Sequence, residues 1–229
     1  MIDIHAHILP DVDDGSTGLD ESIKMLRDAE QQGITDIILT PHYRRDYDKT
    51  EQELLTVFNG FCAEKEKQGI NVNLYLGQEI YIEKEFKKKF KEGLYLPLCG
   101  TKYVLIEFEF NEDHDIAETV YDLLKMGYKP IVAHIERYSY ADRYVAREVK
   151  ALGGYIQVNA DSICGKYKRY LIRKVKALFE EDLVDFVASD IHQMRNIHME
   201  KAYSFVSKKY GKQTAERVFK LNAEKIIKG

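Results

Sequence analysis

Short, β-branched apolar runs alternate with segments of helical periodicity along the whole chain. The runs lie at residues 2–5, 34–40, 72–76, 103–108, 130–133, 155–158 and 184–188. Strands that alternate with helices through short loops indicate a parallel sheet with right-handed crossovers. Seven such units in 229 residues favour a closed barrel over an open sheet. We therefore predict an α/β fold, a seven-stranded (β/α)7 barrel, as a single domain over residues 1–229.

Charge and cysteine usage narrow the functional class. The chain has 34 Lys and Arg against 38 Asp and Glu, a net charge of −4, so no basic field would draw it to nucleic acid. Its three cysteines, Cys62, Cys99 and Cys164, are widely spaced and do not form a disulfide framework. No apolar run approaches the ~20 residues of a membrane span, and His5 leaves no room for a signal peptide. We expect a cytoplasmic protein with no membrane insertion.

Helix boundaries follow from cap and stop residues. We expect helices near residues 50–67, 83–91, 142–152 and 170–181, and a helix after Asp113 or Asp115. Ser16 or Thr17 would cap the first helix and Asn222 the last one. The C-terminal helices offer four core candidates, Phe205, Val206, Val218 and Phe219.

The first fourteen residues contain a metal-binding type of pattern. His5 and His7 stand two residues apart in a strand-like run, so both imidazoles project to one face. Asp11, Asp13 and Asp14 follow before the chain turns. Two neighbouring imidazoles suit a shared cation.

Further metal-binding side chains occur at or just beyond the ends of the other predicted strands. With the first pair they are His5, His7, His42, Glu79, Glu107, His134, Asp190 and His192. The carboxyl ends of barrel strands converge on one face, where active sites lie. The strand that ends at Asn159 is the exception, and we interpret His114 and His198 as surface or capping residues. The sequence predicts a metal centre at this face.

The composition of the cluster indicates its chemistry. Five imidazoles and three or four carboxylates exceed what one tetrahedral zinc needs, and suit two or three divalent ions. Mixed nitrogen and oxygen ligands favour manganese, iron or zinc. Such ions activate water and clamp phosphoryl oxygens. Arg137 is placed to bind phosphate, and Arg44 and Arg45 are either further phosphate ligands or solvated loop residues.

A cysteine-dependent phosphatase is excluded by spacing. That chemistry needs an arginine six positions after the cysteine, and Cys164 is followed there by Tyr170. Metal-activated water is therefore the expected nucleophile.

The motifs together resemble the PHP (polymerase and histidinol phosphatase) superfamily. They are D-I-H-A-H at 3–7, P-H at 41–42, G-Q-E at 77–79, I-E-F at 106–108, A-H-I-E-R-Y at 133–138 and A-S-D-I-H at 188–192. Within it the chain is most similar to the manganese-dependent protein-tyrosine phosphatases of bacterial capsule and exopolysaccharide operons. The resemblance implies a distorted seven-stranded barrel and a trinuclear manganese site, with phosphate held by Arg137. It also implies a substrate, the phosphorylated tail of a cognate bacterial tyrosine kinase.

The resemblance further implies how the ligands are shared. His5, His7, Glu79 and Asp190 would hold one ion, and Glu79 would bridge to a second ion held with Glu107 and His134. A third ion would take His42, His192 and an acid of the D-V-D-D-G loop, for which we choose Asp14 over Asp13.

Four alternative functions remain open from the sequence. They are a small-molecule phosphatase of the histidinol-phosphate type, a nuclease, a metal-dependent amide hydrolase and a catalytically silent metal-binding regulator. The excess of acidic over basic residues argues against the nuclease. The carboxylates at the ends of the third and fourth predicted strands argue against the amide hydrolase.

Overall fold

A computed structural model describes residues 1–165, 168–193 and 196–229. Its strands are β1 (Ile2–Ala6), β2 (Asp36–Leu39), β3 (His42–Tyr43), β4 (Asn73–Leu76), β5 (Glu79–Tyr81), β6 (Tyr103–Glu107), β7 (Lys129–Val132), β8 (Tyr155–Asn159) and β9 (Phe186–Ala188). Each pair of neighbouring strands is parallel. The predicted alternation of strands and helices is therefore confirmed.

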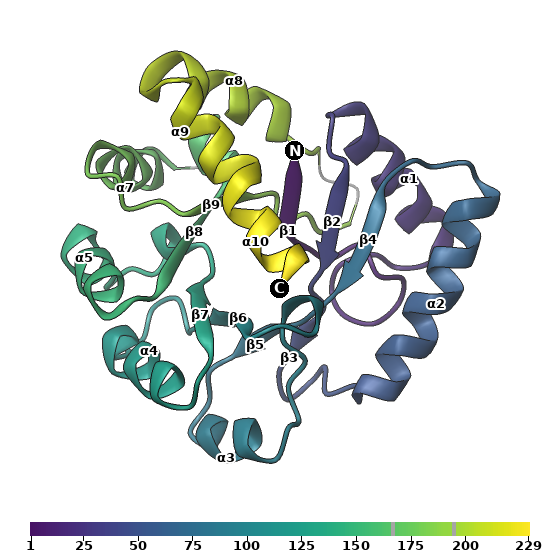
Figure 1. The fold of residues 1–229 in the computed structure, drawn as a ribbon, viewed down its shortest axis with the longest axis horizontal. Coiled ribbons are helices and arrows are strands. Elements are labelled where there is room, and N and C mark those ends of the chain that lie inside the picture. Colours follow the sequence, from purple (N-terminus) through teal and green to yellow (C-terminus); the bar gives the residue numbers. More distant parts are fainter. Residues whose placement is uncertain (166–167, 194–195) are drawn as a thin grey trace.

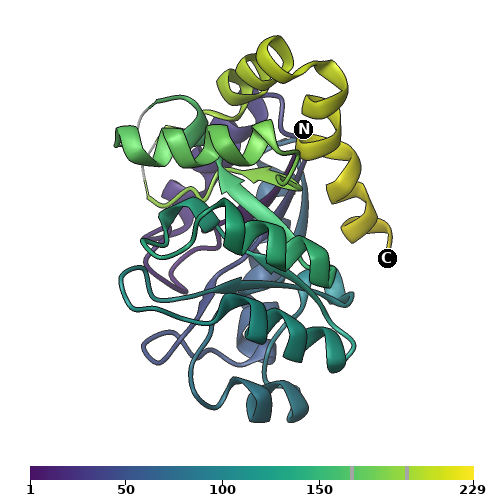
Figure 2. The ribbon, with the colours of Figure 1, turned by 90° about the vertical axis from the view of Figure 1, so that its left-hand side faces the viewer.

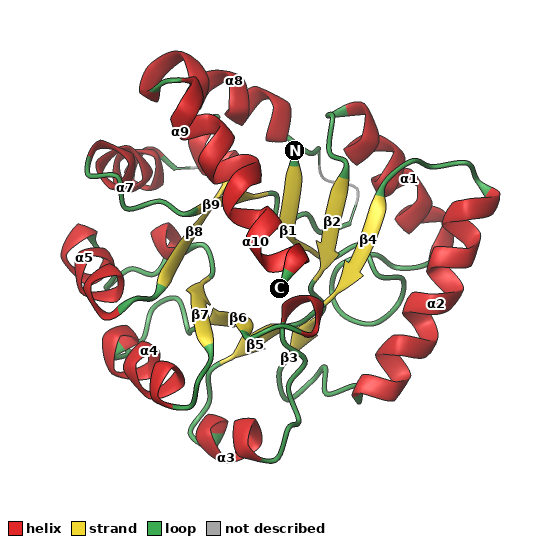
Figure 3. Cartoon of the chain, viewed as in Figure 1, coloured by secondary structure: helices red, strands yellow, loops and turns green. Residues whose placement is uncertain are grey.

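The helices surround these strands. They are α1 (Leu19–Gln31), α2 (Glu51–Lys67), α3 (Phe86–Lys91), α4 (Ile116–Lys125), α5 (Arg143–Leu152), α6 (Ala160–Ile163), α7 (Arg169–Glu180), α8 (Met199–Tyr210), α9 (Lys212–Glu216) and α10 (Asn222–Lys228). Short helical turns η1 (Leu98–Gly100), η2 (Ile135–Arg137) and η3 (Arg217–Leu221) complete the described chain. Figure 1 and Figure 3 show a ring of strands at the centre with most helices outside it.

The strands form a curled parallel arrangement in two sheets. One sheet has the order β1-β2-β4 and the other β3-β5-β6-β7-β8-β9. Two expected strands are each followed, after a break of two residues, by a further short strand that we did not predict: β3 after Thr40–Pro41 and β5 after Gly77–Gln78. Proline has no N–H for a ladder bond, which accounts for the first break. The described chain thus has nine strand segments where we predicted seven strands.

Backbone contacts join the first strand to the last. Ala6 of β1 forms a parallel bridge with Ile191, just beyond β9. The His7 amide donates to the Ile191 carbonyl at 3.0 Å, and the Asp190 amide donates to the His5 carbonyl at 2.9 Å. These bonds bring the two ends of the strand order together.

Apolar residues form two clusters, one between strands and helices and one inside the ring. The inner cluster contains Ile2, Ile4, Ile38, Leu98, Tyr103, Leu105, Ile131, Ala133, Phe186, Ala188, Ala223 and Ile226. Its last two members belong to α10, which lies at one end of the ring of strands (Figure 2). This helix closes that end, so the opposite end is the one available for a site.

Several helix caps match the prediction. Thr50 accepts a hydrogen bond from the Glu53 amide at the start of α2, and Glu53 returns the bond in a capping box. Asp115, rather than Asp113, caps α4. Asp142 caps α5 through bonds from two amides of its first turn.

The predicted cap of the first helix is wrong. The residue before α1 is Gly18, and it makes no side-chain cap. Thr17 instead uses its amide and hydroxyl to bind the Glu21 carboxylate at 2.7 Å. The carboxylate of the helix therefore reaches back to the loop, the reverse of what we expected.

Two predictions in the C-terminal helices are also wrong. Asn222 does not cap α10, because η3 runs into α10 with helical backbone and the Asn222 side chain donates to the Asp185 carbonyl at 3.0 Å. Phe205 is 43% exposed, whereas Val206, Val218 and Phe219 are buried as predicted. Among the described residues, no helix combines the length and apolar character that a membrane crossing needs.

Candidate metal centre

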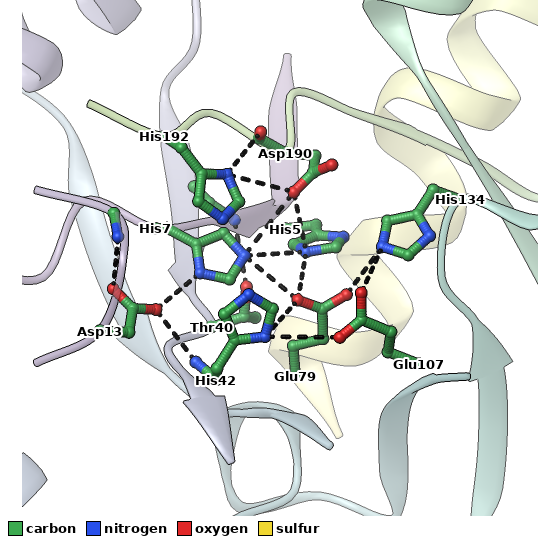
Figure 4. A network of polar contacts seen from close by, with 12 residues as sticks. His5, His7, Asp13, Thr40, His42, Glu79, Glu107, His134, Asp190 and His192 are labelled. Carbon is green, nitrogen blue, oxygen red and sulfur yellow. Dashed lines mark hydrogen bonds and ion pairs between the residues drawn. The ribbon is translucent and has the colours of Figure 1, made fainter. Parts of the chain in front are cut away.

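The predicted metal-binding side chains meet at the open end of the ring of strands. Figure 4 shows these side chains converging from β1, β3, β5, β6 and the segments after β1, β7 and β9: His5, His7, His42, Glu79, Glu107, His134, Asp190 and His192. Asp14, the ninth, lies 3.4 Å from His42 and 3.5 Å from His192. The structure therefore brings together every metal ligand that the sequence predicted.

The two-residue period of a strand places carboxylates above the inner apolar cluster. On β6, Tyr103 and Leu105 belong to that cluster and Glu107 is the next residue on the same face. Phe186 and Ala188 of β9 are followed in the same way by Asp190. The same periodicity thus builds the apolar interior and then the polar rim.

His5 and His7 are held by acceptors on the outer side of the centre. His5 donates from Nδ1 to Oε1 of Gln157 at 3.1 Å, and His7 donates from Nδ1 to Oδ2 of Asp13 at 2.7 Å. A neutral imidazole that donates from Nδ1 carries its lone pair on Nε2. The Nε2 atoms lie 3.1 Å apart and each is 3.2 Å from Oε2 of Glu79. Both imidazoles therefore present ligand atoms to the same point.

Asp13 and Asp14 have different surroundings. The Asp13 carboxylate accepts bonds from His7 Nδ1 and from the backbone amides of Gly15 and His42. Asp14 faces the histidine cluster with one carboxylate oxygen and accepts a bond from Arg44 at 3.0 Å with the other. Asp14 is therefore available as a ligand, whereas Asp13 orients His7.

Glu79 occupies the middle of the centre. Its Oε2 atom lies 3.0 Å from Nδ1 of His42, and its Oε1 atom accepts a bond from Nε2 of His134 at 2.9 Å. Although His42 Nδ1 and Glu79 Oε2 are close, they are not aligned for a hydrogen bond. Among the described residues, these two atoms and Oε2 of Glu107 are buried without any hydrogen-bond partner. Buried polar atoms without partners are costly. A cation between such atoms would satisfy them, so the residues present fit a bound metal.

Among the residues that the structure describes, four groups of donors are compact enough to bind ions. They are His7–Asp14–His42–His192, His5–His7–Asp190, His5–Glu79–His134 and His42–Glu79–Glu107. His5, His7, His42 and Glu79 each belong to two groups. Shared ligands of this kind are typical of closely spaced ions.

The charges of the centre are strongly perturbed. Burial raises the pKa of Glu107, and the nearby Glu79 carboxylate raises it further. Burial would also raise the pKa of Glu79, but His5 and His42 lower it well below its usual range. Burial lowers the pKa of His134 and of His192. Burial would lower the pKa of His5 and His7, but the carboxylates of Glu79 beside His5 and Asp13 beside His7 raise it. Metal ligation requires neutral imidazoles and ionised carboxylates, so a bound ion would displace protons held by His5, His7 and Glu107.

Arg137 extends from η2 towards the mouth of the centre. It donates to Oδ2 of Asp190 at 3.0 Å, and its guanidinium lies 4.4 Å from the centre of the Phe110 ring. Arg137, Phe110 and Arg44 line one cavity of about 140 Å³ together with the metal-binding residues. Arg44 stacks over Tyr47, 5.0 Å from its centre. Arg45 is exposed and is not among the residues that line this cavity.

Sequence reasoning did not identify some residues of the site. Phe110 lies beyond the end of a predicted strand, where no pattern distinguishes it from an ordinary loop aromatic. Gln157 and Asn159 are polar residues inside an apolar strand and are buried at 0% and 1% exposure. The sequence signal that could have identified them is the pair of polar residues two positions apart in an otherwise apolar strand. His114 and His198 lie outside the metal-binding groups, as predicted.

The fold and the site define a class. A curled parallel α/β sheet with imidazoles and carboxylates sharing a buried centre at its open end is typical of metal-dependent hydrolases.

Comparisons identify the family within this class. The family described as "Capsular polysaccharide synthesis, CpsB/CapC" matches residues 1–228, and the chain belongs to this family. It is 34% identical to "Tyrosine-protein phosphatase CpsB" of Streptococcus agalactiae, over 100% of this chain and 98% of that protein. It is 35% identical to "Tyrosine-protein phosphatase YwqE" of Bacillus subtilis, over 100% of this chain and 92% of the relative.

A solved structure agrees with the sequence comparisons. It comes from a study of the crystal structures of YwqE from Bacillus subtilis and CpsB from Streptococcus pneumoniae, described as unique metal-dependent tyrosine phosphatases. The TM-score is 0.93 at 32% identity, over 100% of this chain and 94% of that chain. The predicted resemblance to the capsule-operon tyrosine phosphatases is confirmed.

Proposed function

We propose that this chain is a metal-dependent protein-tyrosine phosphatase that hydrolyses phosphotyrosine by attack of activated water. The observation that carries the proposal is the cavity in which Arg137 and Arg44 meet the shared histidine and carboxylate ligands. Two guanidinium groups beside a metal centre provide sites for phosphoryl oxygens. The names of the relatives support the same activity.

We further propose a trinuclear manganese centre. His5, His7, Glu79 and Asp190 would hold one ion, Glu79, Glu107 and His134 a second, and His42, His192 and Asp14 a third. Iron and zinc suit the same donors. When bound, the ions supply a water of lowered pKa and neutralise the charge of the phosphoryl group.

Arg137 is the residue we assign to the phosphate. Its bond to Asp190 and its stacking on Phe110 fix the guanidinium plane before substrate arrives. A preorganised cation lowers the barrier more than one that must be ordered during the reaction. Arg44, tied to Asp14 and stacked on Tyr47, is the second cation at the mouth.

The leaving group needs little assistance. Phenolate has a pKa of ~10, so it departs with less need of a proton donor than an alkoxide. We therefore assign no general acid, and we propose that the exposed part of Phe110 contacts the phenyl ring of the substrate.

The substrate protein we propose is the phosphorylated tail of a cognate bacterial tyrosine kinase that controls polysaccharide export. The family's role in capsular polysaccharide synthesis supports this choice. We propose a cytoplasmic location, which suits a chain whose cysteines are odd in number and widely spaced rather than arranged as a disulfide framework. We also regard the fold as a distorted seven-stranded PHP barrel, in which β2 with β3 and β4 with β5 each form one bent strand.

Substrate comparison tests the proposed activity. With manganese present, we expect turnover of a tyrosine-phosphorylated peptide to exceed turnover of histidinol phosphate and of a serine-phosphorylated peptide. Preference for histidinol phosphate would favour the small-molecule phosphatase instead. Absence of turnover on every ester by metal-loaded protein would favour the silent regulator.

A further inference from the structure

β8 is the one predicted strand that delivers no histidine or carboxylate to the centre, yet its inner face carries two buried amides. Gln157 and Asn159 are two residues apart, so their side chains share one face of the strand. Gln157 donates from Nε2 to Oδ1 of Asn159 at 2.8 Å. Each amide also bonds to residues of the metal centre on neighbouring segments.

Gln157 connects β1 to the segment after β7. Its Oε1 atom accepts one bond from His5 Nδ1 at 3.1 Å and another from the His134 backbone amide at 2.8 Å. The backbone of His134 has φ 30° and ψ 52°, a left-handed conformation that side-chain-bearing residues rarely adopt. The bond to Gln157 therefore helps to hold His134 in the conformation that aims its ring at Glu79.

Asn159 connects the pair to the segment after β9. It donates from Nδ2 to Oδ2 of Asp190 at 2.7 Å. Arg137 donates to the same oxygen, so Oδ1 is left to face His5 at 3.4 Å and His192 at 3.5 Å. Asp190, like His134, has a positive φ, in this case 51°. Contacts with neighbouring residues are therefore needed to keep its backbone in this conformation.

The donors and acceptors in the hydrogen bonds of Gln157 and Asn159 can be assigned in only one consistent way. Because Oε1 of Gln157 receives two N–H donors, its Nε2 must be the end that donates to Asn159, and Asn159 must then donate to Asp190. A bond from His5 Nδ1–H to Gln157 places the lone pair of His5 on Nε2, which faces His7, Glu79 and Asp190. The amide pair thus selects which atom of His5 and which oxygen of Asp190 are presented to a cation.

We infer that Gln157 and Asn159 are positioning residues that set the metal affinity of the group formed by His5, His7 and Asp190. Outer residues that orient metal ligands typically change affinity about 10- to 100-fold when removed. Neither amide needs to contact the substrate for this role. The inference rests on the proposed metal centre but concerns its affinity, which is measured separately from phosphatase activity.

The test is manganese binding by competition with a fluorescent chelator, on Gln157→Met, Asn159→Leu and the double variant. These substitutions keep the approximate volume and remove the hydrogen bonds. We expect each single variant to bind the tightest ion about 10- to 100-fold more weakly. Because the two residues act through one chain of bonds, the double variant should lose much less than the product of the two single losses.

Asp185→Asn is the matched control. Asp185 is 6% exposed and accepts a bond from the Ile156 amide at 2.9 Å, at the other end of β8. We expect this variant to lower the thermal stability of the chain while leaving manganese affinity unchanged. Circular dichroism establishes that each variant is folded, and Gln157→Ala or Asn159→Ala replaces the variant at the same position if it is not.

Two results would overturn the inference. One is wild-type affinity in folded variants at both positions. The other is an equal loss of affinity in the Asp185→Asn control, which would assign the effect to general destabilisation. If phosphatase activity is lost in variants of wild-type metal affinity, that is a case of the first result, and it does not bear on whether the centre binds metal.

Discussion

The Nε2 atom of His5 lies 3.1 Å from the Nε2 atom of His7. Each imidazole donates from Nδ1 to a different buried acceptor, so in their neutral forms two lone pairs face one another. That arrangement is unfavourable unless a proton or a cation lies between the nitrogens. A metal ion at this point would bind both lone pairs in place of a proton, and this governs how the variants below should behave.

Asp13 and Asp14 should respond differently to amide substitution. Asp14→Asn removes a charged oxygen beside His42 and His192, so we expect about one metal ion fewer per chain at saturation. Asp13→Asn weakens the bond to His7 Nδ1, which should lower affinity about 10- to 100-fold while leaving the ion count unchanged. Metal analysis after dialysis at two manganese concentrations measures both. The reverse pattern would make Asp13 the ligand.

Arg137→Gln should lower kcat/KM for a phosphotyrosine peptide about 10²- to 10³-fold, because it removes the preorganised cation at the phosphate. The metal content should remain near that of the wild type. Arg45→Gln is the control, since Arg45 is exposed and outside the cavity. Equal effects of the two substitutions would refute the role of Arg137.

Phe110→Ala should selectively impair aryl substrates. The ring stacks on Arg137 and lies 5.7 Å from the ring of His134, so it borders both the phosphate site and the metal centre. We expect kcat/KM for phenyl phosphate to fall more than that for an alkyl phosphate, by about 10-fold in the ratio. Phe110→Leu keeps apolar volume and serves as the comparison. An unchanged ratio in the alanine variant would mean that the ring does not contact substrate.

Cys99 should make stability depend on pH above neutrality. Burial raises the pKa of its thiol from 9.0 to about 12. The neutral thiol is favoured in the folded state, so its contribution is complete below pH 9 and is lost as pH rises from 9 towards 12. Denaturant unfolding at pH 8 and pH 10 should therefore show a larger loss for the wild type than for Cys99→Ala. Identical losses would indicate that the folded thiol ionises normally.

The sequence was sufficient to predict which imidazoles and carboxylates gather at one rim, because their positions follow from strand periodicity. Glu107 and Asp190 continue the inward-facing alternation of β6 and β9, and parallel strands bring their carboxyl ends to one rim whatever the loops do. The choice between Asp13 and Asp14 depended instead on how one loop folds, and spacing alone cannot reveal which carboxylate faces inward.

Other features depend on contacts between distant segments. The break between β2 and β3 at Thr40–Pro41 follows from the proline, but the equivalent break between β4 and β5 has no such marker in the sequence. The bonds of Gln157 to His5 and His134 span 152 and 23 residues. Asn222 has the composition of a helix cap, yet tertiary contact with Asp185 uses its side chain differently.

The most direct test is metal analysis combined with turnover of a tyrosine-phosphorylated peptide, for the wild type and for His134→Ala and Glu107→Ala. We predict two or three ions per wild-type chain, loss of turnover with chelator and recovery with added manganese. The two variants should stay folded but lose metal and most of their turnover. Full turnover by metal-free wild-type protein, or by both variants, would contradict the account.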